Sequence, residues 1–325
     1  YEMSASLVGS EMCIRDRAYL GILLLSTVTA GGELSYENLV RTVASGNPLY
    51  LKIAFLFILV GYSCKMEIFP LYTIDVDANF AAPAPASAVI STVLVNAGFV
   101  AFFRVYEVAV VSPVYEWFKH VLILAGLISL LIAAVYLRRT NHYKRFWAYS
   151  TVECMGVAVV ALGVGGAAIF AAVLQVITHA LIKSGVFVLM GQVGKIYGSY
   201  RMNRIGGYIR VHRTGAIALL LGGVSLLAFP PSALFISEMI ILRQIVQMGQ
   251  WWLLVVLALL LCFVMYSLCS RVLQLCFKPV GTPLQAPHLH RSVTWCGLGL
   301  IVIASVLGIV QPPFLIEIIH AVTAF

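Results

Sequence analysis

Five ionisable side chains stand inside long apolar runs, where a charge is costly and therefore marks a functional position. They are Lys65, Glu153, His179, Lys183 and Glu238. His179 and Lys183 are four residues apart, so they share one face of a helix. Two cationic groups this close lower each other's affinity for a proton, and burial acts in the same direction. The pattern predicts a chain of protonatable groups that moves H⁺ or Na⁺.

Two of these groups lie close to prolines that would break a helix. Pro70 follows Lys65 by five residues, and the pair Pro230 and Pro231 precedes Glu238. A proline inside a helix removes a backbone hydrogen bond and bends or interrupts the segment. Two broken helices, each with one ionisable group, are typical of transporters built from inverted repeats.

A structural role stays open for each of the five groups. Lys65 could snorkel toward a helix end, and Glu153 could stabilise the first turn of its helix. His179 and Lys183 could bond buried carbonyl groups, and Glu238 could form a structural salt bridge.

Membrane-spanning helices are the elements that would position these groups. Of the 325 residues, 61% are hydrophobic and 10% are charged, whereas about a quarter of a soluble domain is charged. A spanning helix needs about 20 mostly apolar residues. The sequence therefore predicts an all-α, polytopic membrane protein with about nine transmembrane helices, two of them broken, near Pro70 and near Pro230–Pro231. The expected spans are 18–31, 51–73, 86–106, 114–137, 147–162, 167–192, 215–246, 251–276 and 292–310, followed by a short amphipathic tail, 313–325.

The basic residues give the expected orientation. The formal net charge is +8, and alternate loops carry most of the lysines and arginines, which places those loops in the cytoplasm. Residues 74–85 are expected to be a loop without a basic residue, and Glu67 is expected at the membrane interface. Nucleic-acid binding is excluded, since the positive charge sits in short loops between apolar runs.

Two further expectations concern metals and domains. The seven cysteines form no CxxC pair, and no Cys/His spacing suits zinc or an iron–sulfur cluster, so we expect no metal site. Residues 1–17 are polar and unlike the rest, and they resemble an assembly or adapter scar. Residues 18–325 are expected to be one membrane domain.

Four stretches carry a resemblance to a known family. They are VGYSCKMEIFPLYTIDVDANFAAPAPASAVIS, KRFWAYSTVECMG, QVITHALIKSGVF and LLAFPPSALFISEMIIL. Together they resemble the antiporter-like membrane subunits shared by respiratory complex I, Mrp cation antiporters and group-four membrane hydrogenases. They are most similar to the hydrogenase-4 component F branch.

The resemblance implies roles for single residues. Lys65 falls on the family's broken-helix lysine and Asp77 on the aspartate of the ion-access loop. Glu153 takes the place of an acid typical of the hydrogenase branch. His179 and Lys183 fall on the central relay helix, and Glu238 falls on the acid of the second broken helix.

The resemblance also implies a fold of about fourteen helices with two inverted five-helix repeats, of which this chain holds the C-terminal part. The first helices, with the glutamate that partners the broken-helix lysine, are expected to be absent. The chain departs from the family at several polar positions. The loop histidines are replaced by Tyr72 and Asn79, the loop acid by Ala81, and the Trp-Leu-Pro run by Ile74-Asp75-Val76.

The resulting hypothesis is a proton-translocating membrane-arm subunit of a redox complex of the hydrogenase-4 or NADH:quinone oxidoreductase type. The chain would bind no cofactor, while partner subunits would carry iron–sulfur clusters and nickel–iron or flavin. Its other partners would be further membrane-arm subunits and the lipid bilayer of a bacterial or archaeal plasma membrane. Two alternatives stay open: an Mrp-like cation/proton antiporter subunit, and a diverged, non-pumping structural subunit.

Overall fold

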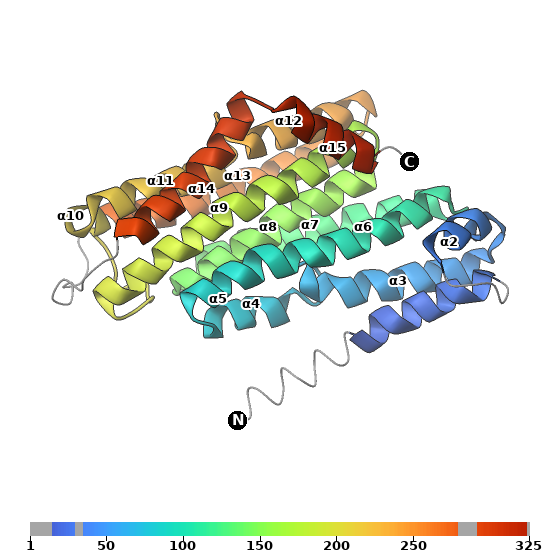
Figure 1. Ribbon diagram of the computed structural model, residues 1–325, viewed down its shortest axis with the longest axis horizontal. Helices are drawn as coiled ribbons and strands as arrows, with labels where there is room; N and C mark the ends of the chain where they lie inside the picture. Colours follow the sequence, from blue (N-terminus) through green and yellow to red (C-terminus); the bar gives the residue numbers. More distant parts are fainter. Residues whose placement is uncertain (1–14, 30–34, 279–290, 324–325) are drawn as a thin grey trace.

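The computed structural model describes residues 15–29, 35–278 and 291–323. These residues form helices and loops, with one isolated β-bridge between His142 and Arg201. The helices build an elongated bundle, and α9 (Ala167–Tyr197) runs through its middle (Figure 1). The prediction of an all-α membrane protein is confirmed. Most of the predicted scar, 1–17, lies outside the described residues.

Within the described ranges, seven helices are long and apolar enough to cross a membrane. They are α3 (Pro48–Lys65), the continuous helix Ala84–Val111, α7 (Tyr115–Arg139), α8 (Tyr143–Val164), α9, α13 (Trp251–Phe277) and α14 (Arg291–Ile309). The helix Ala84–Val111 consists of α5 (Ala84–Val89), a π-helical turn (Ile90–Leu94) and α6 (Val95–Val111).

The count differs from nine because two predicted spans do not form long helices. The first is helical over residues 15–26 and 3-10 helical over Thr27–Thr29, and its last residues lie outside the described ranges. The other, 215–246, is divided into α11 (Arg213–Leu226) and α12 (Ala233–Gln247). Short helices cover parts of the loops and the tail: α2 (Tyr36–Thr42), α10 (Tyr208–Val211) and α15 (Pro313–Thr323).

Both predicted helix breaks are confirmed. The chain leaves helical structure after Lys65 and again between α11 and α12, and Phe69–Pro70 and Pro230–Pro231 are cis peptides. The predicted loop 74–85 is wrong, because α4 (Tyr72–Ala81) occupies most of it. Asp75 in the first turn of α4 suits the positive end of the helix dipole. The helix ends where Pro83 forces Ala82 into extended backbone.

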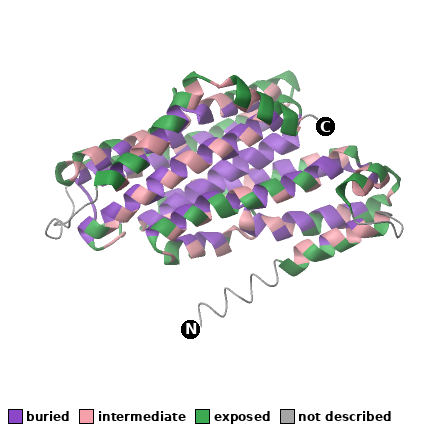
Figure 2. Cartoon of the chain, viewed as in Figure 1, coloured by how far each residue is buried: buried purple, intermediate pink, exposed green. Residues whose placement is uncertain are grey.

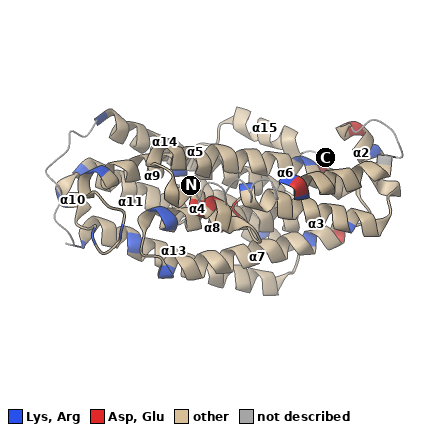
Figure 3. Ribbon diagram, turned by 90° about the horizontal axis from the view of Figure 1, so that it is seen from below, with Lys and Arg blue, Asp and Glu red and all other residues tan. Residues whose placement is uncertain are grey.

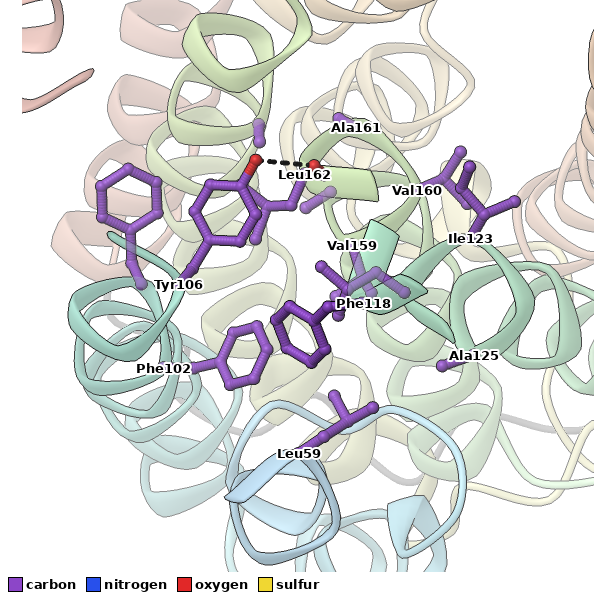
Figure 4. Packing of buried hydrophobic residues seen from close by; sticks show 14 of the residues in the cluster. Leu59, Phe102, Tyr106, Phe118, Ile123, Ala125, Val159, Val160, Ala161 and Leu162 are labelled. Carbon is purple, nitrogen blue, oxygen red and sulfur yellow. Dashed lines mark hydrogen bonds between the residues drawn. The ribbon is translucent and has the colours of Figure 1, made fainter. Parts of the chain in front are cut away.

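The core lies around α8 and α9, which are buried along most of their length (Figure 2). α7 packs closely on α8 because glycines face each other: a Cβ on Gly126 would lie 2.7 Å from the carbonyl oxygen of Gly156. Figure 4 shows the aromatic part of this core, where Tyr106 donates a hydrogen bond of 2.9 Å to the Leu162 carbonyl oxygen. The buried centre of the bundle is therefore the pair of helices that carries most of the predicted site.

Candidate functional site

A line of polar side chains runs along one face of α9. Gln175, His179 and Lys183 follow each other at intervals of four residues, and all three are fully buried. The spacing predicted from His179 and Lys183 is confirmed as a shared helix face. Gln175 was missed, although the same interval, counted back from His179, would have found it.

Lys183 is held by the neighbouring helix α8. Its Nζ donates hydrogen bonds to the Trp147 carbonyl oxygen and to Ser150 Oγ. It also lies 5.6 Å from the ring centroid of Trp147 and 5.8 Å from that of Phe187. Polar and aromatic contacts of this kind reduce the cost of keeping an ammonium group away from water. The bond to a buried carbonyl that the alternative, structural role requires is therefore present, and it fixes Lys183 in the middle of the bundle.

His179 has a different environment one turn away. Neither ring nitrogen has a hydrogen-bond partner among the described residues, and the side chain is fully buried. The open alternative of a histidine bonded to a carbonyl therefore finds no support within these ranges. A buried imidazole with both nitrogens available can accept and pass on a proton.

Glu153 lies in the middle of α8, because this helix begins at Tyr143 rather than at the predicted residue 147. A first-turn role for this acid is therefore wrong. Its side chain is 2% exposed, and Oε2 accepts a hydrogen bond of 3.3 Å from Cys154 Sγ. The charges of Glu153 and Lys183 interact, so α8 supplies an acid opposite the central lysine.

Glu238 lies just beyond the second break, near the start of α12. Its neighbour Ser237 donates a hydrogen bond to Gln175 Oε1, which ties α12 to the polar face of α9. The charges of Glu238 and Glu153 also interact. No ion pair to Glu238 occurs in the part of the chain that the structure describes. The acid thus joins the buried group from the side of the second broken helix.

Lys65 is the last residue of α3, at the first break, and it is partly buried. Gly98 of α6 lies directly against it: a Cβ on Gly98 would come within 2.9 Å of Lys65 Cβ and 3.0 Å of its carbonyl carbon. The close approach of α6 therefore fixes the end of α3 and with it the root of the lysine side chain.

Glu67 is a member of the site that the sequence reading placed wrongly. It was expected at the interface, but it is fully buried inside the break and has a positive φ of 53°. Oε1 accepts a hydrogen bond of 2.7 Å from Asn79 Nδ2, while Oε2 has no hydrogen-bond partner in the described residues. Its charge interacts with those of Asp75 and Lys183. An acid two residues after Lys65 and three before Pro70 is the signal that could have identified it.

Asp77 lies apart from this buried group. Its carboxylate is exposed and forms an ion pair of 2.5 Å with Arg145 Nη2. The Arg145 guanidinium in turn lies 4.5 Å from the ring centroid of Phe80. No three His, Cys, Asp or Glu side chains gather as a metal site within the described ranges. The arrangement is therefore a buried set of acids and bases between two helix breaks, with Asp77 outside it.

Most of the sequence matches one family of transmembrane proteins. Residues 18–265 match the family described as NADH:quinone oxidoreductase/Mrp antiporter, transmembrane, and the chain belongs to this family. It is 32% identical over 212 residues to the hydrogenase-4 component F homolog of Methylacidiphilum infernorum, which covers 65% of this chain and 44% of the relative. It is 28% identical over 267 residues to Na⁺/H⁺ antiporter subunit A1 of Staphylococcus saprophyticus, covering 76% of this chain and 32% of the relative. The chain thus spans less than half the length of these relatives.

Solved structures of low identity share the fold. A chain of the membrane-bound sulfane sulfur reductase, an archaeal respiratory membrane complex, superposes with a TM-score of 0.86 at 21% identity. That match covers 99% of this chain and 65% of the other. A chain of the Mrp complex from Dietzia sp. DQ12-45-1b also gives a TM-score of 0.86, at 15% identity, and covers 99% of this chain and 67% of its own length.

Proposed function

We propose that this chain is part of a membrane-arm subunit of a redox complex, and that this subunit conducts protons through the bilayer. The observation that carries the proposal is the buried polar face of α9. Lys183 and His179 on this face lie between two broken helices that each bring an acid, Glu67 and Glu238. A chain of exchangeable groups at mid-membrane is what proton movement between the two sides requires.

The proposed path joins the two breaks. From Lys65 and Glu67 it continues to Lys183, whose charge interacts with those of Glu67 and Glu153. Glu153 and His179 then connect Lys183 to Glu238 at the second break. A proton added at one end changes the charge that its neighbour feels, so transfers would follow one another along the line.

The same proposal implies partner subunits and an orientation in the membrane. In this proposal the redox groups belong to partner subunits, which would carry the iron–sulfur clusters and the nickel–iron or flavin chemistry. Lysines and arginines gather toward the end of the bundle formed by α10 and the start of α11 (Figure 3), which favours that end as the cytoplasmic one in a bacterial or archaeal plasma membrane.

The test compares two glutamates that differ in position. Glu238→Gln in the full-length protein, assembled in its complex and reconstituted in vesicles, should lower coupled proton transport by about tenfold or more, since groups that transfer protons contribute about 10²–10⁴-fold. Glu317→Gln, on the exposed side of α15, is the matched control and should leave transport unchanged. Equal transport in both variants would remove Glu238 from the path.

A second candidate function is cation/proton antiport. It is favoured by the similarity to an Na⁺/H⁺ antiporter subunit, which covers a larger share of this chain than the hydrogenase-4 component F homolog does. Replacing Na⁺ by choline in the same vesicles separates the two. Proton movement that stops without Na⁺ indicates a cation/proton antiporter, and proton movement that follows the redox reaction without Na⁺ indicates the pump.

A further inference from the structure

A basic pocket lies where α7 ends and α8 begins, and nothing in the proton path uses it. Its volume is about 670 Å³. Arg139, Arg145 and Arg201 line it, and no acidic side chain does. The loop that carries Arg201 leads from α9 to α10, at the end of the bundle toward which lysines and arginines gather (Figure 3).

The walls of this pocket are fixed by backbone hydrogen bonds. Tyr143 N donates to the Tyr200 carbonyl oxygen at 3.0 Å, and Met202 N donates to the Asn141 carbonyl oxygen at 2.9 Å. These two bonds hold the loop after α9 against the turn between α7 and α8. Arg201 is therefore positioned beside the two helices rather than left on a free loop.

The positive charge of the pocket is only partly neutralised. Arg145 is paired with Asp77, but its Nε is buried and has no hydrogen-bond partner in the described residues. Arg139 and Arg201 form no ion pair within those ranges. Burial, and then Lys144, Arg145 and Arg201, lower the pKa of His142 to about 4. The histidine at the pocket wall is thus neutral at physiological pH, and an anion would supply the missing acceptors.

The exposed apolar surface of α7 that leads to the pocket indicates what kind of anion this is. Leu131 and Val135 on α7 are 52% and 40% exposed, and they precede Arg139 by eight and four residues. They therefore form an apolar stripe that leads along the helix to the arginine. Next to the stripe, Tyr136 stacks on Tyr149 with ring centroids 4.9 Å apart. Tyrosines are enriched at the level of lipid headgroups, because the ring is apolar and the hydroxyl polar.

We propose that this pocket binds the phosphate of an anionic phospholipid, with the acyl chains along the exposed face of α7. Arginines suit a phosphate because the guanidinium can donate two parallel hydrogen bonds to it. Basic pockets between helices on the cytoplasmic side are typical positions for such headgroups. A soluble phosphate ion shares the headgroup chemistry but would make no use of the apolar stripe.

The test is lipid retention by the full-length protein in its complex, measured by native mass spectrometry with phosphatidylglycerol against phosphatidylcholine. The pocket variant is Arg139→Gln with Arg201→Gln, which leaves the Asp77–Arg145 pair intact. The matched control is Arg204→Gln with Arg210→Gln, since both arginines are exposed near the same end and the net charge changes equally. If the pocket variant does not fold, Arg201→Gln alone replaces it.

We expect phosphatidylglycerol retention to fall about 30-fold in the pocket variant, because each arginine near an anionic lipid contributes about 1 kcal/mol and 1.4 kcal/mol is tenfold. The single variant should lose about fivefold, and the control should keep the wild-type value. An equal loss in pocket variant and control would overturn the site. Thermal stabilisation by inorganic phosphate that needs the same arginines, without any preference for phosphatidylglycerol, would overturn the lipid assignment.

Discussion

Asn79 donates its Nδ2–H to Glu67 Oε1 across 2.7 Å, and this hydrogen bond joins the first helix break to the half-helix α4. Both side chains are fully buried. The second oxygen of Glu67 and the amide oxygen of Asn79 have no hydrogen-bond partners among the described residues. A buried carboxylate with one donor is a group that an added proton or cation would stabilise.

Asn79→Ala should destabilise the protein, because it leaves the Glu67 carboxylate buried without its donor. The expected loss in the free energy of unfolding is about 1–3 kcal/mol. Thermal unfolding of the purified full-length protein measures it. Asp77→Asn is the control, since this exposed ion pair contributes about 0–1 kcal/mol. A melting temperature for Asn79→Ala no lower than that of the control would show that the hydrogen bond does not hold the break together.

Sequence reasoning found the helices and both breaks, because apolar runs and prolines are local signals. It also predicted that Lys65 lies beside a helix break and that His179 and Lys183 lie within a long helix, because each stands inside an apolar run. It misread residues 74–85 as a loop, although α4 covers 74–81, because two aspartates and an asparagine there suit a turn as well as a helix packed beside a break. Nor could it bring Glu67 to Asn79, since side chains twelve residues apart meet only once the chain has turned back.

Gly98→Ala should also destabilise the protein and shift Lys65. A Cβ at this position would lie 2.9–3.1 Å from atoms of Lys65, including its carbonyl group, so the helices must move apart. Overpacking of this kind costs about 1–3 kcal/mol. Gly299→Ala is the matched control on α14, where nothing lies within 4 Å of an added Cβ. A helical alanine there should be neutral or stabilise by up to about 1 kcal/mol. Equal thermal stability of the two variants would contradict the close approach of α6 to Lys65.

Stability should fall as the pH is lowered from about 6.5 to about 4, because the pKa of His142 is about 4 in the folded protein. A histidine with a depressed pKa contributes stability that is complete above its unfolded pKa of about 6.5, since the unfolded chain binds the proton first as the pH falls. His142→Gln should flatten this part of the stability profile, measured by thermal unfolding across the pH range. An unchanged slope in the variant would show that the cationic pocket does not control His142.

Lys183 gives the most direct test of the proposed proton path, because it is fully buried in the middle of α9 and its charge interacts with those of Glu67 and Glu153. The measurement is coupled proton uptake into vesicles that contain the full-length protein in its complex. The variants are Lys183→Ala and Lys195→Ala, the latter an exposed lysine in the last turn of the same helix. The proposal predicts that Lys183→Ala lowers proton uptake by about tenfold or more while Lys195→Ala keeps the wild-type rate. Unchanged uptake in Lys183→Ala, in a complex that assembles normally, would contradict the path.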